Sequence, residues 1–276
     1  MSTRRILYVL LMALMWPPAL PTPTTAQDLQ VSPVDIAYEE PRNPTFRPYY
    51  EDLKQRKVLE DLQQFLSPLR LPRRVLVMTA ECGTDVVPYQ PGHPVTLCYE
   101  YLARIVTLAP PVTTPTGVSR EDAIVGAFVQ FILHQVSLAV FDLLHTPIWG
   151  RQHDAADNVA AFIMLQFGPD VALRTLRGAV WFFEASNVTW TGSDFARATS
   201  PEAQRFYNYL CIAFGSGDPT ILATVRNTLL KTRRAARCPR EYEKLGHAFR
   251  QTLWPHLDPD RLRKVQSTQW LKPKAK

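Results

Sequence analysis

The sequence predicts a mostly helical α+β protein with a small β-sheet. Segments with the apolar spacing of helices occupy most of the chain after residue 51, and several begin at a recognisable cap. Only two short runs, 74–79 and 95–99, have the β-rich composition of strands. With 46% hydrophobic and 20% charged residues, the composition excludes a mostly disordered chain.

The first 26 residues have the pattern of a cleavable secretory signal peptide. Arg4 and Arg5 precede a short apolar run, 6–15, and small residues ending at Ala26 offer a cleavage site. The apolar run has about half of the roughly 20 residues that a membrane span requires, so an uncleaved anchor is the less favoured alternative. We therefore expect a secreted or periplasmic protein that is cleaved after Ala26.

The N-terminal part of the mature chain is expected to be irregular before the first helix. Residues 27–50 are rich in proline, polar and acidic residues and predict an extended lead-in. Residues 51–66 carry apolar side chains at helical spacing. The runs 74–79 and 95–99 follow, and the loop between them contains proline and glycine, which favours pairing of the two strands.

A long helix is predicted over residues 119–144. Ser119, with Asp122 three residues later, has the spacing of a capping box. The stretch 123–133 is apolar almost all round and is broken only by Gln130, so we expect a buried helix. Further polar residues interrupt its second half, and we do not expect a membrane span.

The rest of the chain is expected to be helical and to complete a single domain over residues 51–276. Ser-Pro and Asp-Pro pairs mark two of the helix starts. The predicted helices are 152–167, 169–185, 203–214, 220–230 and 239–253.

The positive charge lies in the C-terminal region. Residues 221–276 contain 14 Lys or Arg and 4 Asp or Glu, whereas residues 27–220 contain 15 and 21. We interpret the basic helical region as a solvated face, with an anionic or envelope partner as the second interpretation. No nucleic-acid-binding motif accompanies it, so we expect no nucleic-acid partner.

Four cysteines, all in the mature chain, fit two disulfides in an exported protein. Three connectivities are open, and the local pairs Cys82–Cys98 and Cys211–Cys238 are the simplest. The spacings differ from C-x-x-C, which argues against a zinc knuckle or a thioredoxin-type site.

The segment that carries chemistry begins at His134-Gln135 and includes Leu138, followed by a second segment at 150–157. In the motif H-E-x-x-H, residues i and i+4 share one helix face and present two imidazoles to one zinc ion. The glutamate beside the first histidine deprotonates a zinc-bound water. A third ligand usually comes from the next helix, where an aspartate orients a ligating histidine.

These two segments resemble the core of a family of secreted bacterial metallopeptidase-like proteins, defined only as a domain of unknown function. The family core reads approximately H-E-x-G-H-A-x-x-D and then L-P-x-x-G-R-E-E-D-A-A-D, and it corresponds to residues 134–142 and 146–157. The resemblance covers almost all of the mature chain in the expected order. The further matching segments are 81–83, 97–100, 204–208, Cys211, 217–219 and 237–239.

The resemblance implies a zincin-like fold and a site in which most reactive groups are replaced. His134 stands at the first ligand, and Asp157 at the residue that orients it. Gln135 replaces the catalytic glutamate, and an amide has no usable basicity near neutral pH. Leu138 replaces the second histidine and has no donor atom, and His153 replaces the glutamate that would be the third ligand.

Three functional hypotheses follow, and the sequence leaves open whether the chain is an enzyme. The first is an exported, catalytically inactive relative that binds a peptide or protein in the envelope. The second is an active zinc metallopeptidase with His134 and His153 as atypical ligands. The third is a structural helical envelope protein. We expect no cofactor, with zinc as the less favoured outcome, and the sequence does not indicate an oligomeric state.

Overall fold

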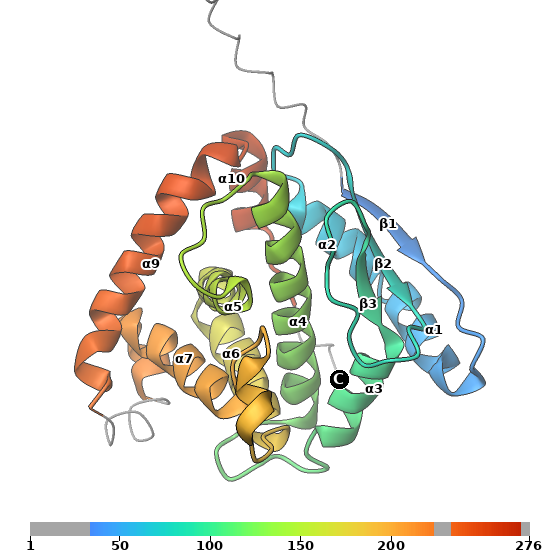
Figure 1. The fold of residues 1–276 in the computed structure, drawn as a ribbon, viewed down its shortest axis with the longest axis horizontal. Coiled ribbons are helices and arrows are strands. Elements are labelled where there is room, and N and C mark those ends of the chain that lie inside the picture. The colour runs from blue at the N-terminus through green and yellow to red at the C-terminus, as the bar shows by residue number, and fades with distance from the viewer. Residues whose placement is uncertain (1–33, 224–232, 272–276) are drawn as a thin grey trace, which may run out of the picture.

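The computed structural model describes residues 34–223 and 233–271, and it is an α+β structure dominated by helices (Figure 1). The predicted signal peptide, 1–26, lies outside the described residues. The predicted helix 220–230 is described only as far as residue 223, where the chain is helical.

The sheet has three parallel strands in the order β1-β2-β3: β1 (Val34–Tyr38), β2 (Val75–Ala80) and β3 (Val95–Cys98). The predicted pairing of the two β-rich runs is confirmed, with Val77 opposite Val95. Strand β1 lies within the expected lead-in 27–50, so the described part of that segment, from residue 34, belongs to the fold. Its partner β2 is about 40 residues away, so no local signal marks it as a strand.

The helices that flank the sheet differ from the prediction in two places. The predicted helix 51–66 is two helices, α1 (Arg47–Gln55) and α2 (Val58–Leu66), because Lys57 between them is left-handed with φ 55°. The helix α3 (Tyr99–Leu108) was not predicted, since it begins directly at the end of β3. The 3-10 turn η1 (Pro44–Phe46) precedes α1.

Helix α4 (Arg120–Leu143) is the central helix and confirms the predicted element. The Ser119 side chain accepts a hydrogen bond from the Asp122 backbone N–H at 3.0 Å. In the described part of the chain α4 alone is long and apolar enough to span a membrane, but 83% of its most apolar segment is buried inside the protein. It is therefore the core helix of the fold.

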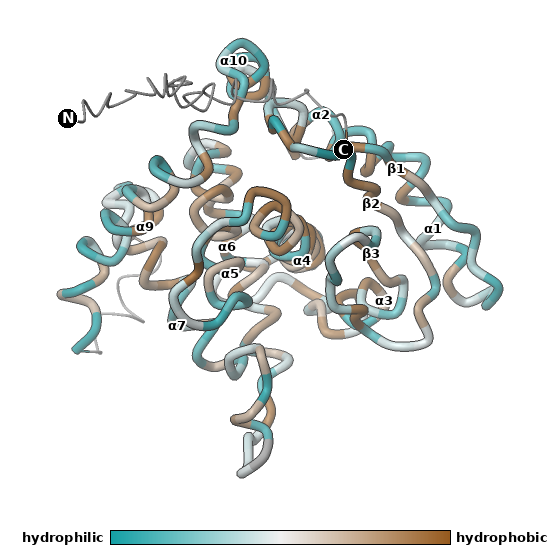
Figure 2. Tube along the Cα trace, turned by 45° about the horizontal axis from the view of Figure 1, so that its top comes forward, coloured by the Kyte–Doolittle hydropathy of each residue, from teal (hydrophilic) through white to brown (hydrophobic). Residues whose placement is uncertain are grey.

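Four further helices confirm predicted elements, and α10 adds one that was not predicted. The elements after α4 are α5 (Gln152–Met164), η2 (Leu165–Phe167), α6 (Pro169–Ala185), η3 (Gly192–Ala196), α7 (Glu202–Gly215), η4 (Ala235–Arg237), α9 (Cys238–Thr252), η5 (Trp254–His256) and α10 (Pro259–Ser267). In Figure 1, α9 forms the edge of the molecule opposite β1 and α1. Figure 2 shows hydrophobic residues concentrated around α4 and hydrophilic residues along α9.

Two disulfides fix the ends of these elements, and both are the simplest pairs. Cys82–Cys98 joins the segment after β2 to the end of β3. Cys211–Cys238 joins α7 to the first residue of α9. Disulfides of this kind are typical of proteins in oxidising compartments.

Candidate functional site

Helices α4 and α5 bring three of the predicted site residues together. The His134 Nδ1 atom lies 2.7 Å from Asp157 Oδ1, and its Nε2 atom lies 3.0 Å from His153 Nδ1. The two imidazole rings are nearly parallel, at 17°. Both ring nitrogens of His134 therefore have hydrogen-bond partners from α5.

Asp157 is the centre of a buried polar network that also includes α7. The Arg205 guanidinium donates to both carboxylate oxygens of Asp157, at 2.7 and 2.9 Å. Gln130, one turn before His134 on α4, donates to the same carboxylate at 3.1 Å. The guanidinium also lies over the Phe183 ring, 4.4 Å from its centroid. Three helices thus converge on one carboxylate.

The electrostatics of this network favour an ionised Asp157. Burial alone would raise the pKa of this carboxyl, but the Arg205 charge and the contact with His134 outweigh burial and hold the pKa well below its usual range. Burial, with the neighbouring His134, lowers the pKa of His153. The network therefore holds a charged carboxylate and an imidazole biased towards its neutral form.

The two other predicted site residues occupy the buried interior of α4. Gln135 and Leu138 are both buried, and Leu138 belongs to the main hydrophobic core. His134 and His153 supply two nitrogen donors, one fewer than the three protein ligands of catalytic zinc sites. The residues present therefore leave a catalytic zinc site incomplete by one ligand.

No carboxylate or thiol in the described ranges supplies that ligand. The Asp154 carboxylate accepts a hydrogen bond from Ser200 at 2.7 Å. One group of three ligand atoms does lie within 4.8 Å, from Cys82, Cys98 and Glu100, but its two cysteines are joined in a disulfide. The donor set around His134 thus remains two imidazoles.

Side-chain contacts link the end of α4 and the start of α5 to neighbouring segments. The Tyr89 hydroxyl donates to Asp142 at 2.9 Å, which ties the loop after β2 to the end of α4. Arg151 contacts the Ser200 hydroxyl at 3.3 Å, so the start of α5 is tied to the segment before α7. These contacts link the segments on both sides of the site to one another.

The loop between α4 and α5 forms the solvent-facing side of the site. Its Trp149 side chain is 98% exposed, and Arg151, two residues later, is also exposed. His153 is half-buried, whereas His134 behind it is buried. Solvent or a partner therefore approaches the network from the side of His153.

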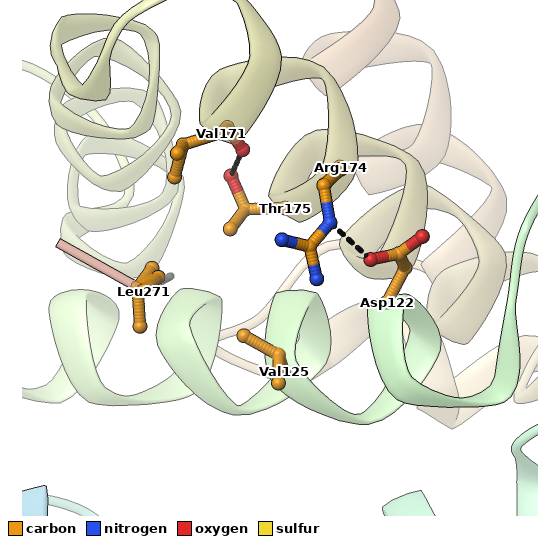
Figure 3. A pocket seen from close by; sticks show the side chains of 6 residues that line it. All are labelled: Asp122, Val125, Val171, Arg174, Thr175 and Leu271. Carbon is orange, nitrogen blue, oxygen red and sulfur yellow. Dashed lines mark hydrogen bonds and ion pairs between the residues drawn. The ribbon is translucent and has the colours of Figure 1, made fainter. Parts of the chain in front are cut away.

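Two hollows in the surface lie elsewhere. The first, between α4 and α6, has a volume of about 10 Å³ and is bordered by the Asp122–Arg174 ion pair (Figure 3). Such a space holds at most about one water molecule. The second, about 130 Å³, lies between α6, α7 and the loop before α4. Ligand pockets usually exceed about 300 Å³, and neither hollow is lined by His134 or His153.

Two members of the network were not identified as site residues from the sequence. Gln130 is a polar residue in an otherwise apolar helical stretch, one turn before His134, and this position was the available signal. Arg205 lies 48 residues after Asp157 in the chain. Its segment matches the family pattern, but nothing local indicates that its side chain turns inward.

Comparison with known proteins gives one match. A family model described as "Putative metallopeptidase" matches residues 38–253. No curated protein and no solved structure matches the chain. The family match begins at the last residue of β1 and spans β2, β3, α4, α5, α7 and all of α9. The chain therefore belongs to this metallopeptidase family, as the resemblance of its core segments implied.

Proposed function

We propose that the chain is a non-catalytic member of this family that binds a peptide or protein at the surface around His153. The observation that carries the proposal is the His134–His153 hydrogen bond at 3.0 Å. It occupies the His134 nitrogen that does not contact Asp157, which is the nitrogen that would bind a metal. The site is thus a closed hydrogen-bond network.

The replaced residues support the loss of hydrolysis. Peptide-bond cleavage by this class requires a base that removes a proton from water, and the amide of Gln135 cannot accept one near neutral pH. Leu138 offers no electron pair at the position where the second imidazole would stand. Both side chains are buried and held by the surrounding core. Neither could supply a general base or a zinc ligand by adopting another rotamer.

The exposed loop supports a binding role. Trp149 exposes almost its whole side chain beside Arg151, and tryptophan and arginine are the residue types that contribute most to binding interfaces. A peptide that covers this loop would bury the indole and approach His153. The peptide chemistry that this favours is an apolar or aromatic side chain next to an acidic group.

An active zinc metallopeptidase is the second candidate, and one observation favours it. The His134 and His153 nitrogens lie close enough for both to contact a single ion, and Asp157 already orients His134. A structural envelope protein, in which the site only stabilises the fold, is the third candidate. The predicted signal peptide supports an exported location for all three.

Metal analysis of the purified mature protein separates the candidates. The proposal expects less than stoichiometric zinc and no cleavage of a mixed peptide library. Stoichiometric zinc that is lost on His134→Ala or His153→Ala, together with cleavage, would establish the second candidate. His93→Ala is the matched control, since this histidine is exposed in the loop before β3.

A binding experiment separates the first and third candidates. Peptides from a displayed random library should be enriched on the immobilised protein, and Trp149→Ala should abolish the enrichment. Trp254→Ala, at an exposed tryptophan outside the site, should leave it unchanged. If no peptide is enriched, or if both variants lose binding equally, the surface around His153 is not a peptide site.

A further inference from the structure

The outward face of α9, together with the N-cap residue Arg237 just before it, carries a row of basic side chains that the proposed site does not use. Arg237, Arg240, Lys244 and His247 are all exposed and follow one another at spacings of three, four and three residues. This spacing places them on one face of a helix. We call these four residues the basic stripe.

The opposite face of α9 is fixed to the protein, so the stripe has a defined orientation. The rings of Tyr242 and Phe249 pack against Phe162 of α5, with centroids 5.6 and 5.1 Å apart. Cys238 at the start of α9 is joined to Cys211 of α7. In Figure 1 the helix forms one edge of the molecule, far from the sheet. The basic stripe therefore points away from the body of the protein.

The charges of the basic stripe are not neutralised within the part of the chain that the structure describes. Arg237, Arg240 and Lys244 form no ion pair there, whereas the neighbouring Arg234 is paired with Glu241 at 2.6 Å. Arg250, near the end of the helix, adds another exposed charge. Three neighbouring cations without an ion-pair partner among the described residues are complementary to a surface of negative charge.

An exposed tryptophan follows the stripe. Trp254 begins η5, separated by one residue from the end of α9, and is 50% exposed. Indole rings prefer the boundary between water and lipid headgroups, where their apolar body and N–H group are both accommodated. A row of cations followed by an exposed tryptophan combines two features that favour an anionic membrane surface, electrostatic attraction to headgroups and an indole at the interface.

From these observations, the geometry points to α9 as a docking surface for a negatively charged lipid membrane. The basic stripe would contact anionic headgroups, and Trp254 would enter the interface. The exposed tryptophan favours a membrane over a soluble polyanion as the partner. A polyanion would interact with the cations alone, whereas a membrane interface also accommodates the indole ring. The site around His153 is not involved.

Vesicle co-sedimentation of the full mature chain tests the proposal. The protein should sediment with vesicles of equal parts phosphatidylglycerol and phosphatidylcholine, and remain in solution with phosphatidylcholine alone. Each basic residue near an anionic surface is worth about fivefold in partitioning, so Arg240→Gln with Lys244→Gln should weaken binding about 25-fold. Added salt should weaken it as well.

Two controls make the result specific. Lys54→Gln with Lys57→Gln removes the same charge from exposed positions at the other edge of the molecule and should leave partitioning within about twofold. Trp254→Ala should weaken binding to vesicles but not to heparin. Thermal unfolding of each variant shows whether it is folded.

Three outcomes would overturn the proposal. One is that the anionic vesicles do not retain the folded protein. Another is that the control pair weakens binding as much as the stripe pair, which would indicate net charge alone. The third is that Trp254→Ala changes nothing, in which case the partner is a soluble polyanion.

Discussion

Arg205 and Asp157 are joined by two hydrogen bonds, of 2.7 and 2.9 Å, at the buried end of the candidate site. The same carboxylate contacts His134, so α4, α5 and α7 meet at one charged group. The network therefore links these three helices through hydrogen bonds to a single carboxylate. The carboxylate is therefore important for stability whether or not the protein is an enzyme.

Asp157→Asn should destabilise the protein strongly. The substitution leaves the Arg205 guanidinium buried beside a neutral amide, and breaking a buried ion pair on one side typically costs about 3–5 kcal/mol. Urea unfolding followed by circular dichroism measures the loss. Asp52→Asn, in the exposed Arg56–Asp52 pair, is the matched control and should cost less than about 1 kcal/mol. Equal losses of unfolding free energy in the two variants would mean that the buried ion pair stabilises the protein no more than an exposed one.

The contribution of Asp157 should vanish in acid. Its folded-state pKa is lower than the unfolded value of about 3.9, so the unfolded chain takes up this proton first as the pH falls. The stabilisation is fully present well above pH 4, declines below it, and is lost as the pH falls through the folded-state pKa. The difference in unfolding free energy between wild type and Asp157→Asn should therefore shrink between pH 6 and pH 3. A constant difference would contradict the ionised state of this carboxylate.

Gly178→Ala should destabilise the contact between α4 and α6. A Cβ atom at Gly178 would lie 1.9 Å from the Asp122 carbonyl oxygen, and backbone cannot move aside as a side chain can. Overpacking of this kind costs about 1–3 kcal/mol or more. Thermal unfolding measures the loss.

Gly246→Ala is the matched control for the glycine substitution. Gly246 is also inside a helix, but its Cβ would meet the Arg250 side chain at 3.3 Å, which can shift. The higher helix propensity of alanine should then leave the protein unchanged or up to about 1 kcal/mol more stable. If both glycine variants lose stability alike, close helix packing is not the cause.

The sequence predicted those helices and strands whose ends are marked by nearby residues, such as a cap or a proline. Helix α4 has a Ser119 cap and a continuous apolar stretch, so its bounds were predicted to within about a residue. The break at Lys57 was missed, because the left-handed conformation of one lysine leaves no mark in the apolar spacing. Strand β1 was missed for a different reason, since its hydrogen bonds come from the distant β2.

The same distinction applies to the site. His134, His153 and Asp157 were predicted from helical spacing and from the resemblance, and their side chains do meet. Whether they bind a metal stays a prediction. The role of Arg205 depends on the packing of α7 against α5 and on the aromatic ring of Phe183, which no local pattern encodes.

The last prediction concerns restoration of the family's reactive groups, with Gln135→Glu, Leu138→His and His153→Glu combined. Without metal, the variant should be less stable than wild type, because it buries a carboxylate and an imidazole in an apolar interior. If the backbone around His134 still suits a metal, zinc at a hundredfold excess over its dissociation constant should return about 2.7 kcal/mol. Thermal unfolding with and without zinc measures this gain.

The same variant with His134→Ala is the control and should gain no stability from zinc. A gain in both variants would place the bound zinc outside the site. A triple variant that stays unfolded at all zinc concentrations would show that the interior has repacked around Leu138 and no longer accommodates the metal site of the family.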